Sequence, residues 1–399
     1  MKLATLRGFS RLTMELLENR ELLSATAITK SPSVDNMSLF QGAAIPGASG
    51  NLDSSGVTKG AGYEYYRYGN QLPASATLTP TPGLGLEGGG NDIDALFAWM
   101  GAKADGGDFL VLGATGNGYY DPYIYKLNRD HPLNSVSTLL VTSLDASSGT
   151  SKDFIVDTIS KANAIFIEGG DQSTYWRLWQ GPIRTAINDA VNVRHVPIGG
   201  TSAGLAVLGQ YIFSAENGTA DSSTVLANPY DASVTLRQDF LDIPLLQNTI
   251  TDTHFYERDR MGRLVTFMDR LVTNYDTPTT GTKGIGVDAE TALLVDLAGG
   301  PTSPTYGNTL VVGNPSKDPI ARHVYFLETD HFKMYTSTST TSFATNPIHV
   351  HKAGIGDTFN LNTLWTTMLG RTSFDSSDYT IIAFWASLES TQKPKKAIY

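Results

Sequence analysis

The chain contains no cysteine among its 399 residues. This absence excludes disulfide bonds, thiolate metal sites and a cysteine nucleophile in one step. A covalent catalyst built from this chain would have to use serine, threonine, lysine or a carboxylate as its nucleophile. The lack of disulfides does not fix the compartment, because a large apolar core can be stable outside the cell without them.

Long apolar runs and long basic runs are also missing. No stretch approaches the roughly 20 consecutive apolar residues of a transmembrane helix, so no membrane span is expected. The 29 Lys and Arg residues are outnumbered by 39 Asp and Glu residues, which gives a formal charge of −10. Because the basic residues form no long run, nucleic acid is not expected as a partner.

Apolar residues, in contrast, are plentiful. They make up 41% of the chain, against 17% for charged residues, which is enough for a sizeable core. The length suits one large α/β domain with extensions, or two modest domains.

The N-terminus has an unusual composition. Residues 1–25 place Lys and Arg around short Leu-rich pieces, without the continuous apolar segment of an ordinary signal peptide. Residues 17–25 (Leu-Glu-Asn-Arg-Glu-Leu-Leu-Ser-Ala) resemble a segment found at the start of many exported planctomycete-type proteins. We therefore expect a secreted or cell-surface protein; a short amphipathic helix on a cytoplasmic protein is the alternative. Residues 26–83, rich in Ser, Gly and Pro, are interpreted as an extension.

From residue 84 the pattern becomes that of an α/β domain. Apolar runs such as 109–112 and 164–167 alternate with amphipathic helical patterns such as 183–191. This alternation predicts a mostly parallel sheet with helices on both faces, a three-layer α/β/α sandwich. We assign residues 84–300 to this core, and expect residues 301–399 to be a β-rich part that completes the core or forms a small appendage.

Gly-rich breaks follow three of the predicted strands, after Leu86, Ile167 and Ile198. In parallel sheets, ligands collect beyond the carboxyl ends of the strands. The breaks are therefore expected to lie together on the rim that carries the functional site.

The break after Ile198 contains a candidate nucleophile. Ser202 lies in Gly200-Thr201-Ser202-Ala203-Gly204, between a short strand and a helical segment. A strand–turn–helix elbow of small residues lifts a serine hydroxyl clear of the sheet, where a base can take its proton. The amide of Ala203, at the start of the helix, is then placed to stabilise an oxyanion.

Several ordered motifs resemble those of cyanophycinases and related serine peptidases. The nucleophile motif is Gly199–Gly204, the upstream Gly-Gly-Asp-Gln loop is Gly169–Gln172, and the downstream histidine block is Asp252–Arg263. A further family strand matches residues 284–292, and residues 106–112 also fit. The resemblance implies a class I glutamine amidotransferase-like fold and a Ser–His–acid site. It also implies exopeptidase action on aspartyl peptide or isopeptide bonds, with cyanophycin or β-aspartyl peptides as substrates, no cofactor, and a homodimer.

His254 is the predicted base, because it alone of the seven histidines lies in a block that matches the family. The acid that orients its imidazole is less well defined. The family's strand carries Asp-Glu-x-Thr-Ala, whereas this chain has Asp288-Ala289-Glu290-Thr291-Ala292. We assign Glu290 as the acid; Asp288 is an alternative, and a site that has lost its acid is a third.

The Gly-Gly-Asp-Gln loop is expected to complete the site. By resemblance, the amide of Gly170 helps to bind the oxyanion, and Asp171 and Gln172 contact the substrate. An ordinary strand–helix loop without a function is the alternative.

The histidine block supplies further candidates for substrate binding: Asp252, Thr253, Arg258, Arg260 and Arg263. Planar arginine forks suit the carboxylates of an aspartyl-rich substrate. For Arg260 and Arg263 a solvated basic face is an equal alternative. Thr253 replaces a glutamine of the family, which reshapes the pocket and weakens the case for strict cyanophycin specificity.

No metal site is predicted. His349 and His351 form an H-x-H pair on the surface of a predicted strand, but no third ligand with suitable spacing accompanies them. Two other functions stay open. An α/β-hydrolase-type esterase would order its triad Ser, acid, His, and would need His323 or a later histidine as base. A non-catalytic descendant that binds a peptide is suggested by the altered Asp-Ala-Glu segment.

Overall fold

The computed structural model describes residues 57–275, 281–316, 321–329, 348–368 and 378–381. The predicted export segment, residues 1–25, lies outside these ranges. Residues 26–56 of the predicted extension also lie outside them. Within the described ranges, no helix has both the length and the apolar character to span a bilayer.

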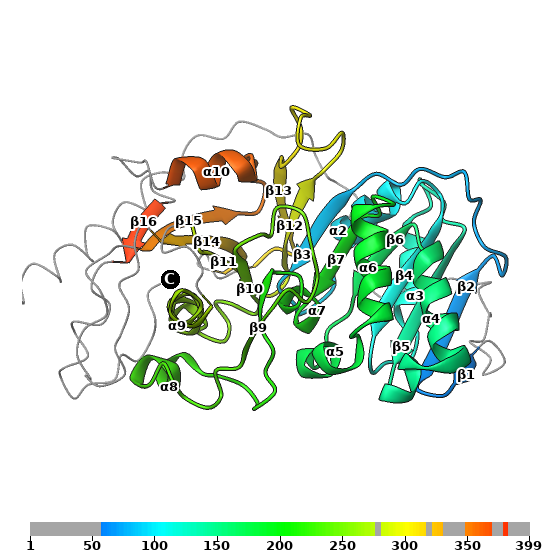
Figure 1. The fold of residues 1–399 in the computed structure, drawn as a ribbon. Coiled ribbons are helices and arrows are strands. Elements are labelled where there is room, and N and C mark those ends of the chain that lie inside the picture. Colours follow the sequence, from blue (N-terminus) through cyan, green and yellow to red (C-terminus); the bar gives the residue numbers. More distant parts are fainter. Residues whose placement is uncertain (1–56, 276–280, 317–320, 330–347, 369–377, 382–399) are drawn as a thin grey trace, which may run out of the picture. The chain divides into compact units, whose positions relative to one another are not determined.

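A nine-stranded sheet forms the larger part of the fold (Figure 1). Its centre, β5-β4-β6-β7-β3, is parallel throughout, and the pairs β2/β5, β3/β12 and β12/β13 are antiparallel. The predicted mixed α/β fold with a large, mostly parallel sheet is therefore confirmed. In sheet order the strands are β1 (Thr58–Gly60), β2 (Tyr63–Gly69), β5 (Ser135–Val141), β4 (Asp108–Gly113), β6 (Ala164–Ile167), β7 (Ile198–Thr201), β3 (Gly83–Glu87), β12 (Thr291–Asp296) and β13 (Thr309–Gly313).

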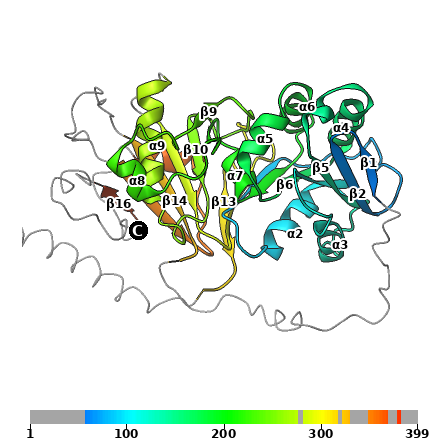
Figure 2. The same ribbon diagram turned by 90° about the horizontal axis from the view of Figure 1, so that it is seen from below.

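Helices cover both faces of this sheet (Figure 2). Because side chains alternate along a strand, Leu110 and Leu112 of β4 pack into the core under α4 and α6, while Phe109 and Val111 pack under α2 and α3. A short 3-10 turn, η3, precedes α4. The bounds are α2 (Asp94–Lys103), α3 (Tyr120–Leu127), η3 (Leu144–Ser147), α4 (Gly149–Lys161), α5 (Gln172–Leu178) and α6 (Pro182–Asn192).

A second sheet of seven strands, in the order β16-β15-β14-β11-β10-β8-β9, has α9 on one face and α10 on the other. The sequence analysis expected one sandwich and did not separate this sheet from the first. Its elements are β8 (Tyr211–Phe213), α8 (Ser222–Ala227), β9 (Leu236–Gln238), β10 (Thr249–Asp252), α9 (Met261–Asn274), β11 (Lys283–Val287), β14 (His323–Thr329), β15 (Ile348–Gly354), α10 (Leu361–Met368) and β16 (Asp378–Ile381).

The predicted limits of the core need correction at both ends. β2 was placed in the extension of residues 26–83, yet all seven of its residues pair with β5. Its four tyrosines lie on both faces of a mostly half-buried strand between β1 and β5, and the surrounding Ser, Gly and Pro residues obscured this pattern. After residue 300, β13 joins the nine-stranded sheet, and β14, β15 and β16 join the other, so this part completes the fold.

Residues 284–292 are not one strand. They divide into β11 and β12, which belong to different sheets, and the turn 288–290 connects them. Glu290 adopts a left-handed backbone conformation with φ of 55°, which no continuous strand accommodates. Asp288 and Glu290 therefore belong to this turn and not to a strand.

Candidate active site

The three Gly-rich breaks meet at one edge of the nine-stranded sheet. β7 lies between β3 and β6, all three are parallel, and Gly200 of β7 is in register with Leu86 and Ile167. The carboxyl ends of the three strands thus bring their following loops together, as the sequence predicted.

Ser202 occupies a strained turn between β7 and α7 (Ala203–Ala206), with φ of 50° and ψ of −116°. Left-handed backbone in a non-glycine residue costs roughly 1–3 kcal/mol and persists only where its surroundings enforce it. Its N–H donates to the Glu87 carbonyl over 3.2 Å. A side chain on Gly204 would collide with the Ile167 carbonyl, so the helix can approach β6 only because that residue is glycine.

His254 reaches the serine from the other sheet. It follows β10 in a left-handed conformation, φ 43°, and its N–H donates to the Gly88 carbonyl over 2.8 Å. Its Nε2 lies 2.9 Å from Ser202 Oγ. A methyl group on Gly89 would lie 2.5 Å from Cε1 and Nε2, so the imidazole lies against bare backbone. The structure therefore brings the two predicted residues within hydrogen-bond distance.

The half-buried imidazole is uncharged at neutral pH. Burial lowers the pKa of His254 to about 4, and the charges of Arg258, Arg260 and Arg263 act in the same direction, while Asp252 opposes them. Nε2 can therefore accept the serine proton.

Glu290 does not occupy the predicted position beside His254. Its carboxylate accepts hydrogen bonds from Asn91 Nδ2 at 3.1 Å and from Arg322 Nη2 at 3.0 Å. Asp288 is also committed elsewhere, because its two oxygens accept the N–H groups of Tyr256 and His323, each over 2.9 Å. In the described ranges no carboxylate bonds to the His254 ring, which is the arrangement of a site without a third acid.

Glu257 takes part in this region, which the sequence analysis missed. One of its oxygens accepts the Ala289 N–H over 2.9 Å, and the other lies 3.2 Å from Arg322 Nη1. Arg322 thereby joins Glu257 to Glu290 and fixes the turn where the family has its glutamate. These contacts join residues 32 to 65 positions apart in the chain, so the sequence gives no signal of them.

Two amides are available near the serine for an oxyanion. The Ala203 N–H is the first of α7, a position whose donor has no partner inside its own helix. Gly169 precedes Gly170 and packs against the serine, since a methyl group on it would lie 3.5 Å from Ser202 Cβ. The loop thus carries the Gly170 amide close to the nucleophile.

The next two loop residues have other partners. The Asp171 side chain caps α5 by accepting the Ser173 N–H over 2.9 Å, which points to a structural role in place of the predicted substrate contact. Gln172 is half-buried, and its Nε2 lies 3.4 Å from the Phe213 carbonyl.

Asp252 and Arg263 form a buried, two-pronged ion pair, with Arg263 Nε 2.7 Å from Asp252 Oδ2. Arg260 is also buried, and donates to the Thr253 carbonyl over 2.7 Å. Asp252, Thr253, Arg260 and Arg263 are all buried and bonded to one another. The two arginines are therefore not a solvated basic face, and the bonds of all four are internal in place of the predicted substrate contacts. Arg258 differs, because its side chain is exposed one helical turn after His254.

Two buried glutamates flank the site, and the sequence analysis gave neither a role. Glu87 at the end of β3 is fully buried, and burial raises its pKa well above the ordinary value. Burial likewise raises the pKa of Glu168, just after β6, to about 8. Glu168 is therefore mostly protonated at pH 7. Across the described part of the chain, no group of three or more His, Asp or Glu side chains is arranged to hold a metal ion.

Comparison with known proteins shows which family this chain resembles. Residues 114–298, just under half of the chain, match the model of Peptidase family S51. The match confirms the predicted resemblance to cyanophycinases and related serine peptidases.

Curated S51 relatives include two cyanophycinases. That of Geminocystis herdmanii is 29% identical over 191 residues, covering 45% of this chain and 63% of the relative. That of Trichormus variabilis is 27% identical over 203 residues, covering 45% of this chain and 60% of the relative. The chain thus spans about three fifths of their length. A crystal structure of a peptidase from an acI-B1 Actinobacterium aligns at 15% identity over 71% of this chain and 98% of that one, with a TM-score of 0.42.

Replacing Gly89 with alanine should displace the imidazole. The added methyl group would occupy space now filled by the His254 ring, and a displacement near 1 Å at a reacting group can lower turnover about 100-fold. Gly356→Ala is a matched control, because Gly356 has a similar φ, 94° against 99°, with no atom near its missing side chain. Both variants should lose similar unfolding free energy, measured by urea denaturation, and only Gly89→Ala should lose hydrolysis. Equal activity of the two would contradict this packing.

Replacing Glu168 with glutamine should flatten the pH dependence of stability. A raised folded pKa stabilises the fold fully below the unfolded value near 4.5, and this contribution is lost as pH rises to about 8. Between pH 5 and pH 8 the free energy of unfolding should fall less in Glu168→Gln than in the wild type, by on the order of 1–4 kcal/mol. Urea denaturation at both pH values measures this. Asp130→Asn, at an exposed position, should leave the wild-type difference intact.

Proposed function

We propose that this protein is a serine exopeptidase that hydrolyses aspartyl-type peptide or isopeptide bonds through an acyl-enzyme on Ser202. The observation that carries the proposal is the 2.9 Å approach of His254 Nε2 to Ser202 Oγ. The curated relatives named cyanophycinases support the aspartyl class of substrate. Cyanophycin and β-aspartyl peptides are accordingly the candidate substrates.

In the first step, Ser202 Oγ attacks the scissile carbonyl carbon while its proton passes to His254 Nε2. The carbonyl oxygen becomes an oxyanion, which the amides of Ala203 and Gly170 stabilise. The imidazolium then donates its proton to the leaving nitrogen as the C–N bond breaks. Water, deprotonated by the same imidazole, hydrolyses the resulting ester and regenerates the serine.

Backbone groups of Gly88 and Gly89 position His254. In a serine protease the third acid fixes the tautomer of the histidine and stabilises the imidazolium. Here the Gly88 carbonyl accepts the backbone N–H of His254, and the ring lies against Gly89. Position is thus maintained, but the imidazolium has three nearby arginines and no carboxylate partner. Turnover is expected to be slow relative to a complete triad.

Arg258 is the residue that we assign to the substrate carboxylate. It is exposed, and of the nearby cations it lowers the pKa of His254 the most, so its charge acts at the reaction centre. A planar guanidinium binds carboxylates in two-pronged fashion, which suits the free carboxylate of an aspartyl residue.

The esterase alternative requires His323 or a later histidine as base. His323 donates its backbone N–H to Asp288, and Ser202 pairs with His254 instead. The geometry therefore favours the peptidase order of residues. A non-catalytic peptide-binding protein is the other alternative, and the missing acid is the observation that favours it.

A fluorophosphonate probe and a peptide panel test the proposal. The probe should label the wild type but not Ser202→Ala, and hydrolysis of β-aspartyl dipeptides should fall at least about 1,000-fold in Ser202→Ala and in His254→Ala. His323→Ala should retain its hydrolysis. Labelling without hydrolysis of any aspartyl peptide would contradict the proposed class of substrate. Absence of both labelling and hydrolysis would contradict the proposed function and favour the non-catalytic alternative.

The pH profile should show a base of unusually low pKa. His254 acts only when its imidazole is neutral, so kcat/KM should rise near pH 4 and stay level through neutrality. Arg258→Gln removes a cation that lowers this pKa, and the acidic limb should therefore move to higher pH. Arg129→Gln, an exposed residue after α3, should leave the limb in place. A limb near pH 6.5 in the wild type would show that His254 is not depressed as the structure indicates.

A further inference from the structure

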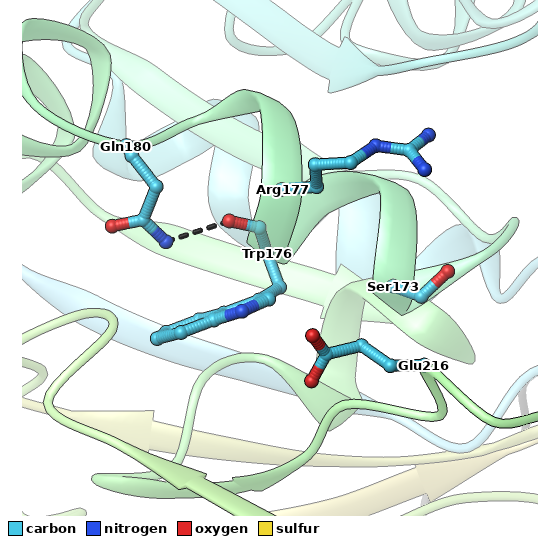
Figure 3. Close-up of a pocket in the computed structure, with 5 residues that line it drawn as sticks. All are labelled: Ser173, Trp176, Arg177, Gln180 and Glu216. Atoms are coloured by element: carbon cyan, nitrogen blue, oxygen red, sulfur yellow. Dashed lines mark hydrogen bonds between the residues drawn. The ribbon is translucent and has the colours of Figure 1, made fainter. Parts of the chain in front are cut away.

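A cleft of about 450 Å³ lies beside α5, the helix that follows the Gly-Gly-Asp-Gln loop. Figure 3 shows Glu216 facing this helix from a separate segment, the one that follows β8. The four other residues that line it recur at helical spacing, so they share one face of α5 and its end. They are Ser173, Trp176, Arg177 and Gln180.

Most polar groups in the cleft already have partners. Glu216 accepts the Ser214 hydroxyl over 2.7 Å and pairs with Arg237 at 2.7 Å. Ser173 Oγ donates to Asp171 Oδ2 over 2.8 Å. Gln180 Nε2 donates to the Trp176 carbonyl over 2.6 Å, the bond drawn in Figure 3. The charge of Glu216 is therefore compensated within the protein.

Arg177 is the exception. It is exposed, and in the described part of the chain its guanidinium has neither an ion pair nor a hydrogen bond. Since Arg237 and Glu216 pair with one another, Arg177 is the one charged lining residue without an ion pair among the described residues, in a protein whose formal charge is −10. Beside it, Trp176 is half-buried and offers an apolar wall.

The cleft begins close to the nucleophile but does not coincide with it. Ser173 is four residues after Gly169, which packs against Ser202, and four residues span at most about 14 Å. Arg177 lies one helical turn farther, about 6 Å along the axis.

We propose that this cleft is a subsite for an acidic oligopeptide, in which Arg177 binds a substrate carboxylate several residues from the scissile bond. The two-pronged guanidinium supplies the charge-assisted contact, and the indole of Trp176 packs against the peptide's apolar atoms. The inference rests on the proposed function, and it assigns the substrate as a chain of aspartyl residues with more than two members.

Peptide length and charge separate this subsite from the reaction centre. Three substrates are compared: a β-aspartyl dipeptide, an octapeptide with the same scissile linkage flanked by aspartates, and its asparagine counterpart. Arg177→Gln should raise KM for the aspartate octapeptide about tenfold, with kcat unchanged, because one charge-assisted contact is lost. KM for the other two should not change. Arg177→Lys should give an intermediate KM, and Arg129→Gln the wild-type value.

Calorimetry on the full-length Ser202→Ala protein provides a readout that does not need turnover. It should bind the aspartate octapeptide about tenfold more tightly than Ser202→Ala/Arg177→Gln, at constant ionic strength. Equal binding by the two proteins, or no binding by either, would overturn the subsite. If the wild type cleaves no peptide while binding still depends on Arg177, the subsite stands and the proposed function fails. If the dipeptide is cleaved and replacement of Arg177 has no effect, the proposed function stands and the subsite fails.

Discussion

The contact between Ser202 Oγ and His254 Nε2 depends on how closely three backbone segments can approach one another. Each residue adopts a left-handed conformation at the end of a strand, and the strands belong to different sheets. The segment Gly88–Gly90 lies between them, accepting the His254 N–H and leaving room for its ring. A side chain on Gly89 would collide with the His254 ring, and side chains on Gly88 or Gly90 would collide with the turn 288–290. The site is therefore set by the junction of the sheets more than by either sheet alone.

The same junction explains how the site differs from its family. The turn 288–290 passes from one sheet to the other, and its acids serve the turn itself: Asp288 accepts two backbone N–H groups, and Glu290 pairs with Arg322. Glu257 then bonds the amide of Ala289, the residue that replaces the family's glutamate. The carboxylates of Asp288, Glu290 and Glu257 therefore bond within this turn and its neighbours. His254 keeps its position beside Ser202, but among the described residues no carboxylate bonds to its ring.

Local patterns in the sequence predicted the parts of this arrangement that are themselves local. The strand, turn and helix around Ser202 can be read from small residues beside an apolar run, and His254 could be assigned because its block resembles the family's. Glu290 was misassigned because its role depends on Arg322, more than 30 residues away, and on a left-handed φ that residue type does not reveal. Arg263 looked like a substrate ligand because sequence gives no sign that Asp252 is buried beside it. Burial and long-range pairing are properties of the folded chain.

The buried carboxyl groups also alter how the folded molecule behaves as a polyelectrolyte. The count of −10 treats every Asp and Glu as ionised, yet burial raises the pKa values of Glu168 and Asp121 to about 8. The native protein is thus less negative than its composition indicates, and its isoelectric point lies above the sequence value of about 5.1. In an electric field, folded and unfolded molecules of this one chain would migrate as two species of unequal mobility.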